Sequence, residues 1–189
     1  MSNTDHAHGA DLIGVGAGVT MRRDAILWRP VLTVEKYHGD DLTADPYETV
    51  TKVGNLLTTA GLTRITGLIV ASGGQGLTNT ATRLGVGNSS TAAAVGQTDL
   101  QAAAGAGNRF FMTMDATFPS AAAGVITAKA TVGTADGNFA WNEWCLDIGT
   151  PTVTSGTTVN ACMVNRAVQS LGTKTSAGTW VATATITIS

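Results

Sequence analysis

Charged side chains are scarce in this chain. Lys, Arg, Asp and Glu make up 13% of its 189 residues, against about a quarter in an average globular protein. The formal net charge is -2, so composition offers no clustered positive charge of the kind that nucleic-acid binding normally needs. Low charge with many small side chains suits a protein whose surface is largely covered by neighbouring chains, and we expect no nucleic-acid partner.

Long apolar runs are also missing. The chain has no stretch of about 18 consecutive apolar residues, which excludes a membrane-spanning helix. The opening residues, Met1 to His6, lack the basic and apolar regions of a secretory signal. We therefore expect no membrane partner and a chain that is made in the cytosol.

Familiar catalytic and cofactor motifs do not occur. The chain has no Gly-x-Ser-x-Gly elbow, no phosphate loop and no His-Glu-x-x-His. Its three histidines are His6, His8 and His38, and a His-x-His near a terminus is more typical of a solvated tail than of a metal site. The glycines in 14–18 imitate a dinucleotide-binding loop, but the charged residues 22–24 interrupt the helix that should follow. We expect no cofactor, no metal and no catalytic residue.

One enzymatic alternative stays open because carboxylates need no motif. Glu143 and Asp147 fall on the same side of a predicted strand, and an acidic pair in a groove could serve a carbohydrate-active hydrolase. Paired acids on the polar face of a strand are common, so the prediction is a non-enzymatic protein.

Cysteine is limited to Cys145 and Cys162, whose spacing fits no metal site. Both lie in strand-like sequence and could be neighbours. For a chain made in the cytosol we favour buried thiols over a disulfide.

Large apolar side chains concentrate in 138–148, which we interpret as the central strand. Trp144, Leu146 and Ile148 share one face of it at period two, whereas Phe139 and Trp141 lie on the other parity. That switch predicts a bulge near Asn142 or a strand buried on both faces. The last strand alternates just as cleanly through Trp180. The predicted core comprises Trp144, Leu146, Ile148, Trp180, Ile186 and Ile188.

The remaining patterns predict a mainly β fold. Strands follow one another without crossover helices, which favours an antiparallel β-sandwich or a jelly-roll-like domain over residues 31–189. One helix is expected near 55–71, with Asn55 as its N-cap and an apolar face that plugs an opening of the β core.

Residues 1–30 read as an extended N-terminal arm. The segment has too few periodic apolar residues to pack as a domain, yet it is too apolar for a solvated tail. We expect it to lie against a neighbouring subunit. The predicted contact residues are Leu12, Ile13, Arg22, Arg23 and Trp28.

Four stretches in conserved order along 31–189 resemble a family of tailed-bacteriophage virion proteins. They are Gly54-Asn55-Leu56-Leu57 with its helix, Arg83-Leu84-Gly85-Val86-Gly87-Asn88-Ser89-Ser90-Thr91-Ala92 leading to Gln97-Thr98-Asp99-Leu100, Asn138-Phe139-Ala140-Trp141-Asn142-Glu143-Trp144, and Asn165-Arg166 through Leu171-Gly172-Thr173-Lys174 to the terminal strand. The first thirty residues depart from the pattern.

The resemblance implies a structural protein of the virion and brings no catalytic residue. It favours a capsid decoration (cement) protein that binds the major capsid protein or other virion proteins on the outside of the head. A homo-oligomer is expected, with a trimer favoured. A minor tail or fibre-associated protein that touches the host surface through loops such as 72–80 is the alternative.

Overall fold

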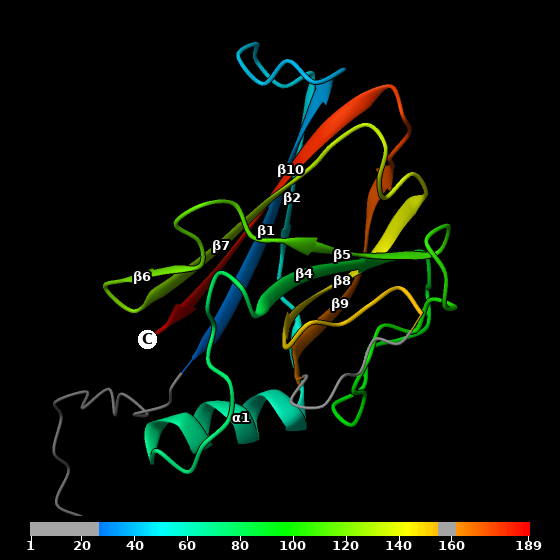
Figure 1. The fold of residues 1–189 in the computed structure, drawn as a ribbon. Coiled ribbons are helices and arrows are strands. Elements are labelled where there is room, and N and C mark those ends of the chain that lie inside the picture. Colours follow the sequence, from blue (N-terminus) through cyan, green and yellow to red (C-terminus); the bar gives the residue numbers. More distant parts are fainter. Residues whose placement is uncertain (1–26, 155–161) are drawn as a thin grey trace, which may run out of the picture.

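The computed structural model describes residues 27–154 and 162–189, which form two five-stranded antiparallel sheets and one helix (Figure 1). The first sheet has the order β2 (Glu48–Val53), β1 (Trp28–His38), β10 (Gly178–Ile188), β7 (Val125–Val132) and β6 (Ser120–Ala122). The second has the order β3 (Leu56–Leu57), β9 (Cys162–Thr173), β8 (Ala140–Ile148), β4 (Thr82–Gly87) and β5 (Arg109–Thr113). This confirms the predicted mainly β fold class.

The two sheets pack face to face over a shared core. Alternate residues of β1, such as Leu32 and Val34, meet side chains of the second sheet such as Leu84 in one cluster. Within this cluster the Trp141 and Trp180 rings pack edge to face, with their centroids 4.8 Å apart. Of the residues predicted to form the core, the structure buries Trp144, Leu146, Ile148, Trp180 and Ile186. Ile188 differs: it is only partly buried, because β10 reaches the end of the sandwich there.

β8 is the central strand of its sheet and is buried on both faces. Trp144, Leu146 and Ile148 point into the core between the sheets, and Cys145 packs in a second cluster on the outer face. The pairing of β8 with β9 also shifts register between Trp141 and Glu143. Both explanations of the parity switch therefore hold. The two cysteines are free and buried, as predicted.

The helix, α1 (Thr59–Ile69), is shorter than expected and begins four residues later. Its N-cap is Thr58, whose hydroxyl accepts a hydrogen bond from the Gly61 amide at 2.9 Å, and not Asn55. Asn55 instead accepts a hydrogen bond from the Trp28 indole at 3.0 Å, while β3 pairs with β9. Strand pairing has overridden a local capping signal.

The boundary between arm and domain also differs from the predicted residue 30. β1 begins at Trp28, which pairs with Ile188 and packs against the core of its own chain. Four of the predicted arm contacts, Leu12, Ile13, Arg22 and Arg23, lie outside the described residues. α1 closes one end of the sandwich, and the loop 39–47 lies at the other (Figure 1).

Candidate functional site

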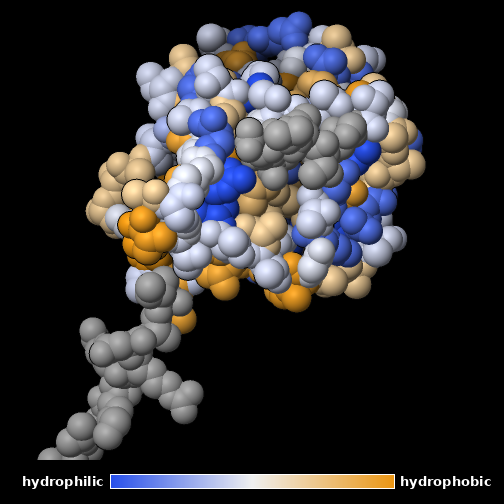
Figure 2. Space-filling model, turned by 60° about the horizontal axis from the view of Figure 1, so that its bottom comes forward, coloured by the Kyte–Doolittle hydropathy of each residue, from blue (hydrophilic) through white to orange (hydrophobic). Residues whose placement is uncertain are grey.

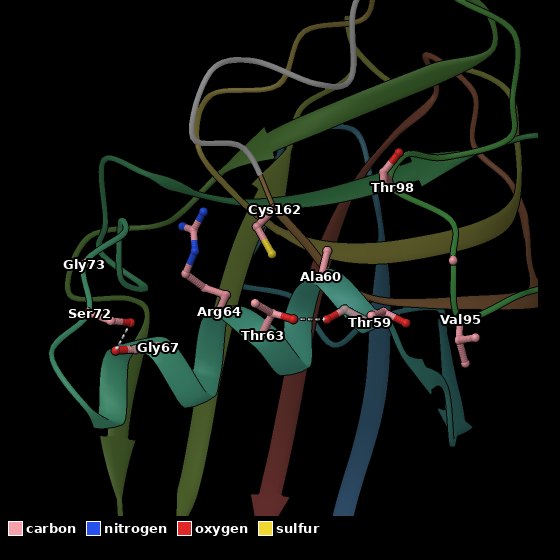
Figure 3. A pocket seen from close by; sticks show the side chains of 11 residues that line it. Thr59, Ala60, Thr63, Arg64, Gly67, Ser72, Gly73, Val95, Thr98 and Cys162 are labelled. Atoms are coloured by element: carbon pink, nitrogen blue, oxygen red, sulfur yellow. Dashed lines mark hydrogen bonds between the residues drawn. The ribbon is translucent and has the colours of Figure 1, made fainter.

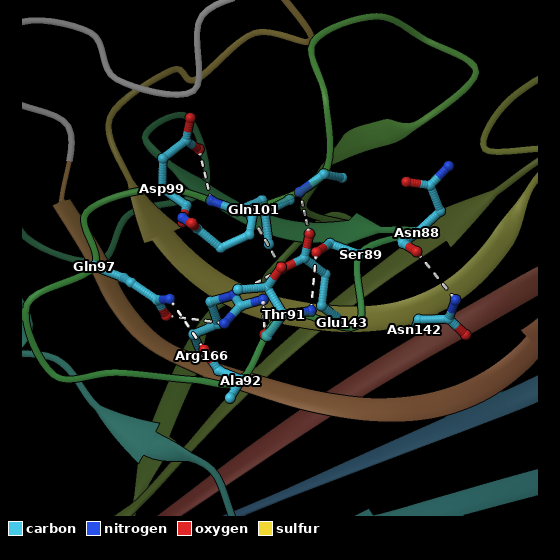
Figure 4. Close-up of polar contacts among 12 residues, drawn as sticks. Asn88, Ser89, Thr91, Ala92, Gln97, Asp99, Gln101, Asn142, Glu143 and Arg166 are labelled. Carbon is cyan, nitrogen blue, oxygen red and sulfur yellow. Dashed lines mark hydrogen bonds and ion pairs between the residues drawn. The ribbon is translucent and has the colours of Figure 1, made fainter.

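A buried ion pair lies on the outer face of the second sheet (Figure 4). Glu143 on β8 and Arg166 on β9 are both fully buried, and the Arg166 Nε donates to Glu143 Oε2 at 2.6 Å. Such a pair is tolerated in the interior only when further hydrogen bonds satisfy its remaining polar atoms. Those bonds come from a single long loop, residues 88–108.

Each member of this ion pair binds a different part of the loop. Glu143 accepts the backbone N–H groups of Gln101 and Ala102 at 3.1 and 2.7 Å. Arg166 donates to the Thr91 carbonyl at 2.8 Å and to the Gln97 side chain at 2.9 Å. The ion pair therefore fastens a loop that would otherwise leave the outer sheet face open.

Asp147 lies four residues beyond Glu143 on the same side of β8, but its surroundings differ. Its side chain is fully buried, and no other side chain of the described residues hydrogen-bonds to it. The backbone N–H groups of Cys162 and Ile148 lower its pKa only in part. Burial, reinforced by the negative charge of Asp99, raises the pKa of Asp147 to about 8. The acidic pair considered from the sequence is thus one carboxylate committed to an ion pair and one enclosed within the fold.

The thiols are similarly enclosed. Burial, with Asp147 and Glu143 nearby, raises the pKa of Cys145 well above its ordinary value. Burial also raises the pKa of Cys162. Since the thiolate is the reactive form, neither environment favours a nucleophile.

An open cavity of about 620 Å³ lies between α1 and residues 95–98 (Figure 3). Arg64 and several hydroxyl groups face it. The Thr63 hydroxyl donates to the Thr59 carbonyl at 2.9 Å, and the Ser72 hydroxyl donates to the Gly67 carbonyl at 3.2 Å. Arg64 donates to the Gln75 carbonyl at 2.8 Å. The cavity is large enough for a small ligand, but these polar groups already have partners within the helix and its following loop.

A second cavity, which we call the α1 groove, is apolar and has a volume of about 230 Å³. It lies where α1 meets the ends of the sheets. Its walls are Trp28, Arg64, Ile65, Leu68, Ile69, Leu77, Ile126, Ile148, Val164 and Ile188. Three predicted residues thus meet at this site: Trp28, expected in the arm, and Ile148 and Ile188, expected in the core.

Exposed apolar side chains surround the groove. Ile69 and Val70 are 76% and 72% exposed, and Leu62 is 52% exposed. Leu27, the first described residue, is also exposed. Figure 2 looks onto this end of the molecule and shows hydrophobic residues gathered there. Large exposed apolar patches on a folded protein mark interaction sites.

Sequence patterns did not predict two of these features: the buried Glu143–Arg166 ion pair and the exposed apolar residues of α1. Nothing in the sequence indicates that Glu143 faces Arg166 from the adjoining strand. The apolar face of the predicted helix includes Leu68 and Ile69, whereas the structure leaves both exposed.

No protein-family model, curated protein or solved structure matches this chain with significance. Within residues 27–154 and 162–189, no group of three or more His, Cys, Asp or Glu side chains is arranged to hold a metal ion. No helix in these ranges has the length and apolar character needed to cross a membrane. The apolar end around α1 is the surface best suited to a partner.

Proposed function

We propose that this chain is a structural protein of a tailed-phage virion, most specifically a capsid decoration protein that binds the outside of the head shell and stabilises it. Its partners are then the major capsid protein or other virion proteins and further copies of itself, with a trimer favoured. Assembly would take place in the host cytoplasm. The sequence resemblance supplies the protein class, and the low charge agrees with a surface made for contacts.

The observation that carries the proposal is the exposed apolar end on a firmly braced sandwich. Ile69 and Val70 are exposed, whereas the large apolar residues of the strands are buried or half-buried except for Val53. Burying such side chains at an interface contributes about 25 cal/mol for each Å² removed from water. The Glu143–Arg166 pair meanwhile fixes the longest loop, so little ordering entropy is lost when the domain binds.

The test is addition of the purified chain to phage heads assembled without it. The proposal predicts saturable binding over the whole head and a higher temperature for head disruption. Binding confined to tails, or no binding to either structure, would overturn it.

An exposed loop next to the larger cavity favours the alternative, a minor tail or fibre-associated protein. Residues 71–75 and 78–80 are exposed, and Ser72 and Gly73 line the cavity. A host surface component could contact this loop. Immunogold labelling separates the two functions, since the alternative predicts gold at tail tips and the decoration role predicts gold over the head.

A further inference from the structure

We propose that the α1 groove receives the apolar residues Leu12 and Ile13 from the N-terminal segment of a neighbouring copy. This inference rests on the homo-oligomer within the proposed function and adds the receiving site and the residues that enter it.

The chemistry of the groove selects an aliphatic side chain. Nine of its ten lining residues are apolar, and Ile148 and Val164 come from the ends of β8 and β9. Its volume of about 230 Å³ is below the roughly 300–1,000 Å³ of typical small-molecule sites. The space suits one or two branched aliphatic side chains better than a cofactor.

The N-terminal segment joins the sandwich at the rim of this groove. Leu27 and Ser189 exchange backbone hydrogen bonds of 2.7 and 3.3 Å, and the next residues inward, Trp28 and Ile188, both line the groove. The 14 residues from Leu27 back to Ile13 span at most about 50 Å when extended. Leu12 and Ile13 are therefore within reach of a groove on an adjoining copy.

The exposed residues around the groove favour a neighbouring copy as the source. Val70 and Leu62 are exposed but do not line the groove, so a segment inside the groove does not by itself account for them. Copies that associate through this end bury those residues and also place the root of each segment beside the groove of the next copy. Exchange of identical segments is a low-cost route to a closed oligomer.

Thiol cross-linking between two full-length variants tests the arrangement. One variant carries Leu12→Cys and the other Ile69→Cys, which changes an exposed groove residue. The variants are mixed and treated with a short bismaleimide, with wild type as the blank because Cys145 and Cys162 are buried. We expect a covalent dimer that contains one chain of each variant. Its absence would overturn the proposal.

The double variant, with both changes in one chain, distinguishes the two sources of the segment. When this double variant is mixed with an excess of wild type, most of its neighbours carry neither new cysteine. We therefore expect few cross-links between chains and no cross-link within one chain. An efficient internal link would show that the chain fills its own groove and would overturn the proposal.

Association in solution gives an independent measurement. Ile69→Asp places a charge in the groove and should weaken self-association at least tenfold by light scattering. Leu42→Asp, an exposed apolar residue in the loop at the opposite end, is the matched control and should leave association unchanged. If both variants self-associated as strongly as wild type does, the inference would be contradicted. Head binding with no cross-link defeats only this inference, whereas cross-linking with no head binding defeats only the proposed function.

Discussion

At the scale of single residues, Glu143 and Asp147 are two buried carboxylates on one strand whose surroundings differ. Both are fully buried on one face of β8. Glu143 meets Arg166 and two backbone amides, whereas Asp147 has no side-chain partner among the described residues, and burial raises its pKa to about 8. One carboxylate stabilises a loop, and the other makes stability depend on pH.

The first prediction concerns Asp147→Asn. Burial raises the pKa of Asp147 from 3.8 to about 8, so the folded chain holds one more proton than the unfolded chain between those pH values. The free energy of unfolding should therefore fall by up to about 1.4 kcal/mol for each pH unit as pH rises through this window. The variant should match wild type near pH 4 and exceed it at pH 9 by more than about 1.4 kcal/mol. Urea unfolding at a series of pH values measures this difference, and two parallel curves would contradict the assignment.

Glu143→Gln is the second prediction. It leaves the buried Arg166 charge without its counter-ion and should cost about 3–5 kcal/mol of unfolding free energy. The amides of Gln101 and Ala102 should also exchange with deuterium faster, because both donate to Glu143. The control is Glu48→Gln, whose half-exposed carboxylate pairs with the buried Lys36. Because Lys36 keeps its contact with the Trp180 ring, this change should cost less than Glu143→Gln. If the two variants lost similar amounts of unfolding free energy, the result would argue against the role of Glu143 in holding the loop.

At the scale of elements, α1 is joined to β9 by a close approach that only glycine permits. A Cβ on Gly61 would meet the backbone of Val164, whereas a Cβ on Gly67 would meet only the Ser72 hydroxyl at 3.0 Å. The two glycines sit in one helix, so they provide a matched pair.

The third prediction is that Gly61→Ala destabilises the chain by at least about 1–3 kcal/mol, because the added methyl group overpacks a backbone contact. Gly67→Ala should be neutral or stabilising by up to about 1 kcal/mol, since alanine favours the helix and the Ser72 side chain can rotate away. Thermal unfolding compares the two. A destabilised Gly67→Ala together with an unchanged Gly61→Ala would contradict the packing described for α1.

The elements also show how far sequence patterns reach. Period-two alternation located β8 and β10 and five buried core residues, because a half-buried strand must alternate. It did not locate the start of α1, since Asn55 has the chemistry of a cap but is engaged by Trp28. Nor could helical periodicity show that Leu68 and Ile69 are exposed among the described residues. An apolar helix face that meets a neighbouring chain has the same sequence pattern as one that meets its own core.

At the scale of the whole molecule, the proposed oligomer would join the N-terminal segment and the α1 end in one assembly surface. Because β1 begins at Trp28, the segment that can be removed without touching the sheet ends at residue 26. The fourth prediction is that deletion of residues 2–26 leaves a folded sandwich with weaker self-association and weaker head binding. Circular dichroism and light scattering follow the two properties separately. Full association after truncation would remove the segment from the assembly, and loss of folding would place it in the core of its own chain.

The decoration role is tested most directly by the number of copies of this chain in each purified virion. Quantitative mass spectrometry can measure its ratio to the major capsid protein. A protein that covers the head should be present on the order of hundreds of copies, because each closed oligomer repeats over a symmetric shell. A count of a few tens or fewer would contradict the decoration role and place the chain in the tail.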